Sequence, residues 1–124
     1  MMPLVIISRK SDVVSDGDVL YLSEILQDAV ADVLDIEENP NARLTKDDVE
    51  VRVREPGPLD RNASNLAIEI IANDYPERRA DLQRAAETIA DIVRNNFEDL
   101  IEEGKLGENS FVWILLAPTG FAII

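Results

Sequence analysis

The side chains that most often carry enzyme chemistry are missing from this chain of 124 residues, which contains no cysteine and no histidine. Without cysteine there is no thiolate nucleophile, no disulfide and no thiolate metal site. Without histidine, both the Ser-His-Asp arrangement and the commonest zinc ligand are excluded. Any catalysis must use carboxylates, lysine, arginine, tyrosine, hydroxyl groups or the chain's own α-amine.

The acidic residues do not form a recognisable metal site. The pairs Glu37-Glu38, Asp47-Asp48 and Glu102-Glu103 lack the spacing by which a shaped loop brings several oxygens onto a hard cation. Solvated charge is the simpler interpretation of these pairs. The five glycines are scattered and form no phosphate-binding loop. We therefore expect neither a metal nor an organic cofactor.

Two arginines stand out in this strongly acidic protein. The net charge is -13, from 25 acidic and 12 basic residues, and such a surface repels nucleic-acid backbones. Arg52 and Arg54 lie two residues apart in an alternating segment, which places both on one face of a strand. Their guanidinium groups offer a planar fork to a small anionic substrate with a carboxylate. The alternative is an exposed pair neutralised by Glu50 and Glu55.

Three more residues are candidates for the wall of a substrate pocket. Arg9, with Lys10 beside it, follows the first strand. It could face the same pocket opening as Arg52 and Arg54, although a solvated strand end is the simpler interpretation. Trp113 could line the pocket if the first and last strands are close neighbours; otherwise it belongs to the core or to a subunit interface. Tyr75 lies between a strand end and a helix start, where it could form the pocket rim.

The elements that position these residues follow from the hydrophobic pattern. Alternation of valine with charged residues indicates one strand, short apolar runs indicate three others, and apolar residues at helical spacing indicate two helices. Gly104 and Gly107 are expected to terminate the second helix. The predicted strands are 4–7, 49–53, 66–72 and 111–116, and the predicted helices are 22–36 and 76–103.

This order predicts an α/β fold in a single domain, residues 1–124, made of two β-α-β halves: a four-stranded mixed sheet with both helices on one face. Valine, isoleucine and leucine fill both faces of three of the strands, and the tail 120–124 is also apolar. We therefore expect a homo-oligomer that covers the open face. No apolar run reaches the ~20 residues of a membrane span, and the run 4–7 is too short for a signal peptide, so we expect a cytoplasmic protein.

The ordered set of motifs resembles the tautomerase superfamily, and most closely its 5-carboxymethyl-2-hydroxymuconate isomerase branch; macrophage migration inhibitory factor is more distantly similar. The resemblance rests on the opening Met-Pro-Leu-Val-Ile-Ile of residues 2–7, on the element order, on the stretch 66–79 and on the segment 94–100. It spans nearly the whole chain. It implies a homotrimer with a pocket between subunits, an N-terminal proline that moves a proton, and arginines that bind the substrate carboxylate.

Within this resemblance, Pro3 is the candidate catalytic base. An ordinary α-amine titrates near ~8, and burial in an apolar pocket disfavours its cation, so a buried prolyl amine is neutral near physiological pH. An amide nitrogen cannot act in this way, and Pro3 must therefore be the first residue of the mature chain. Here the sequence departs from the family pattern, because Met1 and Met2 both precede Pro3. If either is retained, Pro3 is only a proline at the start of a strand.

Three functions are consistent with these observations. The first is a cofactor-free tautomerase acting on a small unsaturated keto or hydroxy acid. The second is a non-catalytic trimeric binding or structural protein on the same fold, with Pro3 blocked by Met1 and Met2. The third is a ferredoxin-like regulatory domain, which shares the element order and binds a small ligand.

Overall fold

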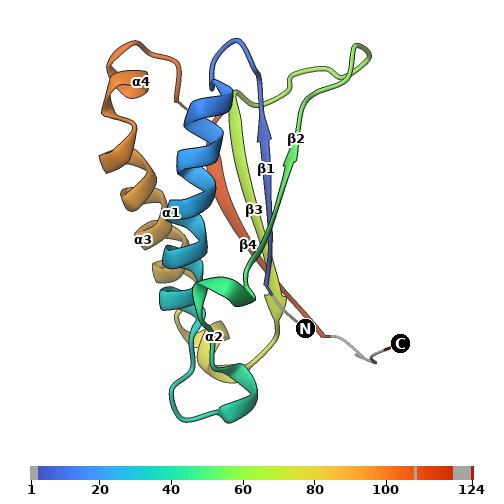
Figure 1. Ribbon diagram of the computed structural model, residues 1–124, viewed down its shortest axis with the longest axis vertical. Coiled ribbons are helices and arrows are strands. Elements are labelled where there is room, and N and C mark those ends of the chain that lie inside the picture. Colours follow the sequence, from blue (N-terminus) through green and yellow to red (C-terminus); the bar gives the residue numbers. More distant parts are fainter. Residues whose placement is uncertain (1–2, 108, 119–123) are drawn as a thin grey trace.

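The computed structural model describes residues 3–107, 109–118 and 124, and in this part of the chain a four-stranded sheet carries its helices on one face (Figure 1). The strands are β1 (Leu4–Arg9), β2 (Glu50–Arg54), β3 (Leu66–Asn73) and β4 (Phe111–Ala117). The helices are α1 (Asp16–Leu34), α2 (Pro76–Ala80), α3 (Leu82–Asn96) and α4 (Glu98–Glu102), and two short 3-10 turns, η1 (Pro40–Ala42) and η2 (Lys46–Asp48), precede β2.

The strand order β2-β1-β3-β4 confirms the predicted mixed α/β sheet. β1 is parallel to β2 and β3 is parallel to β4, whereas the central pair, β1 and β3, is antiparallel. Each β-α-β half therefore joins two directly adjacent strands. A ferredoxin-like fold instead splits its β-α-β units by inserting another strand, so the topology contradicts the third functional interpretation.

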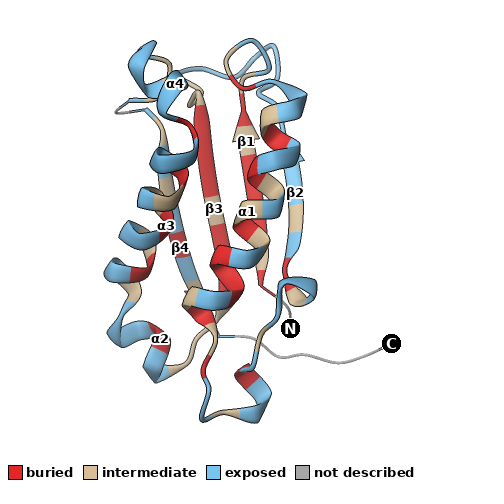
Figure 2. Cartoon of the chain, turned by 60° about the vertical axis from the view of Figure 1, so that its left-hand side comes forward, coloured by how far each residue is buried: buried red, intermediate tan, exposed pale blue. Residues whose placement is uncertain are grey.

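The strand register sorts the side chains of the sheet onto two faces. Ile7 lies opposite Val53 on one side and Ile68 on the other, whereas Ile6 lies opposite Arg52 and Glu69. The helices cover the face that carries Ile7, and Figure 2 shows β1 and β3 as buried strands behind α1 and α3. The buried residues of that face include Val5, Ile7, Ile68, Ile70 and Ile114.

Helix α1 begins earlier than the apolar spacing alone indicates, because Ser15 caps it. The Ser15 side chain accepts a hydrogen bond from the backbone N–H of Asp18, and the Asp18 carboxylate accepts one from the backbone N–H of Ser15. This capping box satisfies two donors that the first turn leaves free. The predicted core stripe of α1 is confirmed, with Leu22, Leu26 and Val30 fully buried.

The second predicted helix is corrected by the structure, which divides it into α2, α3 and α4. The breaks fall at Asp81 (φ -113°, ψ 18°) and Phe97 (φ -130°, ψ 39°). Phe97 is buried and its ring meets the ring of Tyr21 on α1 edge-on, with centroids 5.9 Å apart. Tertiary packing of this aromatic pair accounts for a bend that helical periodicity does not indicate. Gly104, at φ 72°, ends α4 as predicted.

The face of the sheet away from the helices carries exposed apolar side chains. Trp113 is 61% exposed, Leu115 53% and Phe111 42%. The predicted excess of apolar residues on this face is therefore confirmed, and its cover by other subunits remains a prediction. The apolar tail 120–124 is a second reason to expect a homo-oligomer, but its residues 120–123 lie outside the described residues. No helix in the described part of the chain is long and apolar enough to cross a membrane.

We expect Leu26→Ala to lower the free energy of unfolding by about 3 kcal/mol, because it removes a fully buried side chain and leaves a cavity. The matched control is Leu20→Ala on the same helix, where the side chain is 70% exposed and the expected change is below about 0.5 kcal/mol. Urea unfolding of both variants measures the difference, and equal losses would contradict the assignment of the α1 core face.

Candidate active site

Pro3 lies directly before β1, in the middle of the sheet between β2 and β3. It is less than 2% exposed, and its carbonyl accepts a hydrogen bond at 3.0 Å from the backbone N–H of Glu50. The residue is therefore buried at one end of the sheet, where its backbone is tied to the start of β2. Met1 and Met2 lie outside the described residues, so the prediction about the mature N-terminus stays a prediction.

Tyr75 lies at the same end of the sheet as Pro3, because β3 runs antiparallel to β1 and ends where β1 begins. Tyr75 occupies the position before the first turn of α2, and the guanidinium of Arg78 lies 5.0 Å from the centre of its ring. Arg78 is buried and donates a hydrogen bond to the carbonyl of Leu34 at 3.0 Å. Burial lowers the pKa of Arg78, and neighbouring groups, Tyr75 first among them, oppose that shift. In one protomer the Tyr75 ring covers this buried cation.

Arg52 and Arg54 project from the open face of β2, at the edge of the sheet. Arg52 pairs through Nε with Glu50 Oε2 at 2.8 Å, which matches part of the alternative interpretation. Within the described residues no carboxylate lies within 4 Å of the Arg54 guanidinium. Arg54 lies opposite Ser8, five residues along β1 from Pro3. At the rise of an extended strand this separates Arg54 from Pro3 by roughly 17 Å, so the two residues occupy opposite ends of the sheet.

The expectation that Arg9 faces the same pocket opening as Arg52 and Arg54 is wrong. β1 continues to Arg9, which falls on the helix-covered face and is 7% exposed. Its guanidinium donates to the carbonyl of Val14 at 2.7 Å and forms ion pairs with Asp16 at 2.5 Å and Glu55 at 3.2 Å. Arg9 therefore holds the loop before α1 and the end of β2 against the sheet. Glu55 pairs with Arg9, not with Arg54.

Trp113 is separated from the first strand, since β3 lies between β1 and β4. The expectation that the first and last strands are close neighbours is therefore wrong. On the open face Trp113 lies beside Glu69 of β3, in a cross-strand row that continues through Ile6 to Arg52. Most of the surface of Trp113 is exposed in this chain. It does not wall a pocket around Pro3 of its own protomer.

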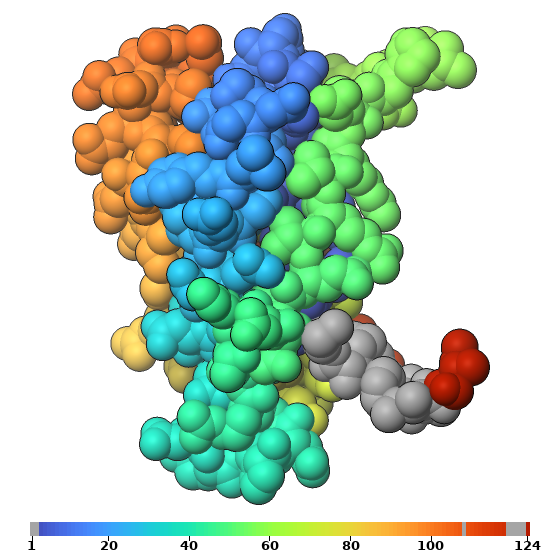
Figure 3. Space-filling model, in the orientation of Figure 1, coloured from blue at the N-terminus to red at the C-terminus, as the bar shows by residue number. Residues whose placement is uncertain are grey.

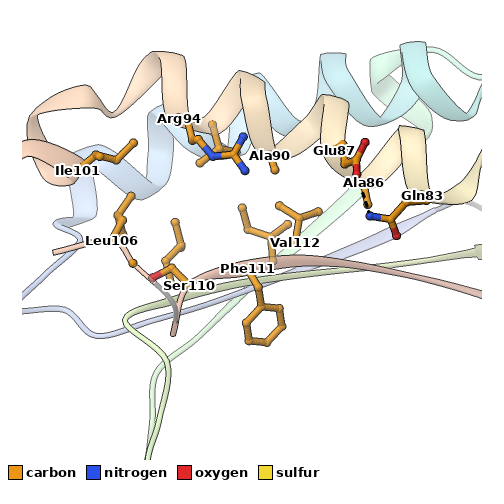
Figure 4. Close-up of a pocket in the computed structure, with 14 residues that line it drawn as sticks. Gln83, Ala86, Glu87, Ala90, Arg94, Ile101, Leu106, Ser110, Phe111 and Val112 are labelled. Atoms are coloured by element: carbon orange, nitrogen blue, oxygen red, sulfur yellow. Dashed lines mark hydrogen bonds between the residues drawn. The ribbon is translucent and has the colours of Figure 1, made fainter. Parts of the chain in front are cut away.

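A cavity of about 460 Å³ between α3, α4 and β4 was not anticipated from the sequence (Figure 4). None of the predicted site residues lines it, and Pro3 lines neither this cavity nor a smaller one of about 280 Å³ beside the end of α1. The sequence signal that could have revealed it is the pair of small residues Ala86 and Ala90. Their i, i+4 spacing puts both on one face of a helix that packs on a strand.

Comparison with known proteins places this geometry in a known fold. No family model and no curated protein matches the sequence. Among solved structures, a 5-carboxymethyl-2-hydroxymuconate delta-isomerase superposes with a TM-score of 0.58 at 18% identity, over 99% of this chain and 85% of that one. N1, a member of the cis-3-chloroacrylic acid dehalogenase family, gives a TM-score of 0.52 at 15% identity, over 93% of this chain and 75% of that one.

Both structures belong to the tautomerase superfamily, and both match this chain across nearly all of its length. At such low identity the match bears on architecture and not on individual residues. The β-α-β-β-α-β order, the antiparallel centre of the sheet and the single helical layer all agree with it. The chain therefore has the tautomerase fold, as the sequence resemblance predicted.

Proposed function

We propose that this protein is a cofactor-free tautomerase or isomerase that moves a proton between carbon and oxygen of a small unsaturated keto or hydroxy acid. The observation that carries the proposal is the position of Pro3, which is buried at the head of the central strand of a tautomerase fold. The two structural neighbours are named for reactions of unsaturated carboxylic acids, which is the substrate class proposed here.

The chemistry needs one group that can accept and return a proton. In the enol-to-keto direction the substrate hydroxyl loses a proton, a carbonyl forms, and a carbon of the former double bond gains a proton. A prolyl secondary amine can carry that proton without any cofactor, provided that it is the chain terminus. Burial favours the neutral amine, because it removes water from around the cation. Pro3 as first residue would then be a base near neutral pH.

The substrate carboxylate requires a cation, and we assign this role first to Arg54. Its guanidinium has no carboxylate partner within the described residues, whereas Glu50 competes for Arg52. Because Pro3 and Arg54 lie at opposite ends of one sheet, a small acid cannot contact both within one protomer. We therefore propose a homotrimer in which the open faces cover one another and the arginines of one protomer approach Pro3 of the next.

A second function, binding without catalysis, is favoured by one specific feature: Met1 and Met2 precede Pro3. If either is retained, the Pro3 nitrogen is an amide and has no basic lone pair. The intact mass of the untagged protein distinguishes the two functions. Loss of both methionines supports the tautomerase, and retention of either supports a trimeric binding or structural role.

We expect the chain that begins at Pro3 to ketonise phenylenolpyruvate or 2-hydroxymuconate, and Pro3→Ala in that chain to lower kcat by about 10²–10⁴-fold. This is the usual contribution of a positioned general base. The matched control keeps Pro3 but retains Met2 before it, and should be equally slow because its nitrogen is an amide. Turnover that is unchanged in both variants would remove Pro3 from the mechanism.

We expect Arg54→Ala to raise KM for an acidic substrate by about tenfold and to leave KM for its methyl ester unchanged, since only the acid forms a charge-assisted hydrogen bond. Arg52→Ala should have a smaller effect, because Glu50 already engages Arg52. Steady-state kinetics on acid and ester measure both. Equal changes for the two substrates would argue against a carboxylate-binding arginine.

We expect Trp113→Glu to dissociate the proposed trimer, because it places a charge in the apolar face that partners would bury. Leu20→Glu, which changes a residue of similar exposure on the helical surface, should leave the assembly intact. Light scattering coupled to gel filtration measures the molar mass. A wild-type protein that is already monomeric would refute the proposed assembly.

A further inference from the structure

We propose that the cavity between α3, α4 and β4 binds a small molecule that has an apolar body and a carboxylate, at a site separate from Pro3. Its volume of about 460 Å³ falls within the range of ordinary ligand pockets. Its walls are mostly apolar, with a small number of polar groups among them (Figure 4). The proposal does not depend on the tautomerase function, because it uses none of the residues assigned to that function.

The cavity exists because small side chains of α3 face the edge strand. Ala86 and Ala90 point toward Val112 of β4, and Leu66 and Ile68 of β3 contribute to the lining (Figure 4). The cavity is open to solvent on one side, because Gln83, Glu87 and Arg94 along its rim are exposed, and the small side chains of α3 leave it unfilled. The apolar lining favours an occupant with an apolar body.

Two polar groups of the lining have unused hydrogen-bonding capacity. The hydroxyl oxygen of Ser110 is buried and has no hydrogen-bond partner within the described residues, and it must rotate about χ1 to meet a ligand in the cavity. Arg94 engages Asp91 through Nη1, and within the described part of the chain its other guanidinium nitrogens donate to no acceptor. A hydroxyl and a guanidinium together form a donor set suited to a carboxylate.

The charges along α3 set the orientation of the ligand. Glu87 also lines the cavity, and its carboxylate accepts a hydrogen bond from the Gln83 side chain at 3.1 Å. Seven residues of helix separate Glu87 from Arg94, a rise of about 10 Å. Figure 4 shows Glu87 and Gln83 toward one end of the cavity and Arg94 nearer the other. We therefore place the ligand carboxylate beside Arg94, where repulsion from Glu87 is weakest.

The site lies at the opposite end of the sheet from Pro3. Phe111 and Ser110 mark the start of β4, and β4 runs parallel to β3, whose first residue Leu66 pairs with the last residue of β1. Pro3 precedes the first residue of β1. A ligand in this cavity would therefore leave the Pro3 end of the sheet free.

The test uses phenylacetate and benzyl alcohol, which share a ring and differ in the carboxylate, as probes of the intact protein. We expect phenylacetate to bind at millimolar or lower concentration and to shift the backbone amide resonances of 86–94 and 110–112. Ala90→Phe, which fills the cavity, should abolish binding, and Ala80→Phe, the same change at an exposed position of α2, should not. The site would be refuted if phenylacetate did not bind, or if its binding survived Ala90→Phe.

The polar assignment is tested by substitutions of Arg94 and Ser110, with Arg84 as the control position. Arg94→Gln should weaken phenylacetate binding by about tenfold without affecting benzyl alcohol, whereas Arg84→Gln on the exposed face of α3 should change neither. Ser110→Ala should also weaken phenylacetate. Equal affinity for both probes, or no effect of Arg94→Gln, would overturn the carboxylate preference. We expect Arg52→Ala and Arg54→Ala to bind phenylacetate as the wild type does, because this site is distinct from the proposed active site. Loss of phenylacetate binding in these variants would refute that distinction.

Discussion

The antiparallel pairing of β1 with β3, from Leu4 opposite Ile71 to Arg9 opposite Leu66, is the contact on which the other features depend. It joins the two β-α-β halves edge to edge, and its register sends Val5 and Ile7 to the same side as Ile68 and Ile70. The helices must then cover that one side. The other face, with its exposed aromatic side chains, is left to solvent or to another subunit.

The same pairing gives the two ends of the sheet different chemistry. Pro3 and Tyr75 lie at one end, because β1 begins where β3 ends. At the other end Arg9 is enclosed by its ion pairs, and Arg54, at the edge of the sheet, has no carboxylate partner among the residues that the structure describes. Beyond it, the loop that follows β2 stands away from the body of the molecule (Figure 3). A site that uses both Pro3 and Arg54 therefore has to be assembled from more than one copy.

The proposed active site and the proposed cavity site draw on different physical features of this fold. The first depends on burial of Pro3, which the single chain already provides, and on the covering of an apolar sheet face, which requires a partner subunit. The second depends on small residues of α3 and on the unsatisfied hydroxyl of Ser110, which one chain already contains. Each proposal can fail without affecting the other.

The sequence by itself determined the four strands and the first helix, because helical spacing, alternation and caps are local properties. The valine–arginine alternation of β2, the core stripe of α1 and the glycine stop after α4 could all be predicted in this way. Only the tertiary structure decided which side of the sheet Arg9 faces, since that depends on β1 continuing two residues beyond its apolar run. The separation of Trp113 from β1, the bend at Phe97 and the cavity beside Ala90 likewise depend on strand order and packing. These are contacts between segments distant in the chain, and no local pattern encodes them.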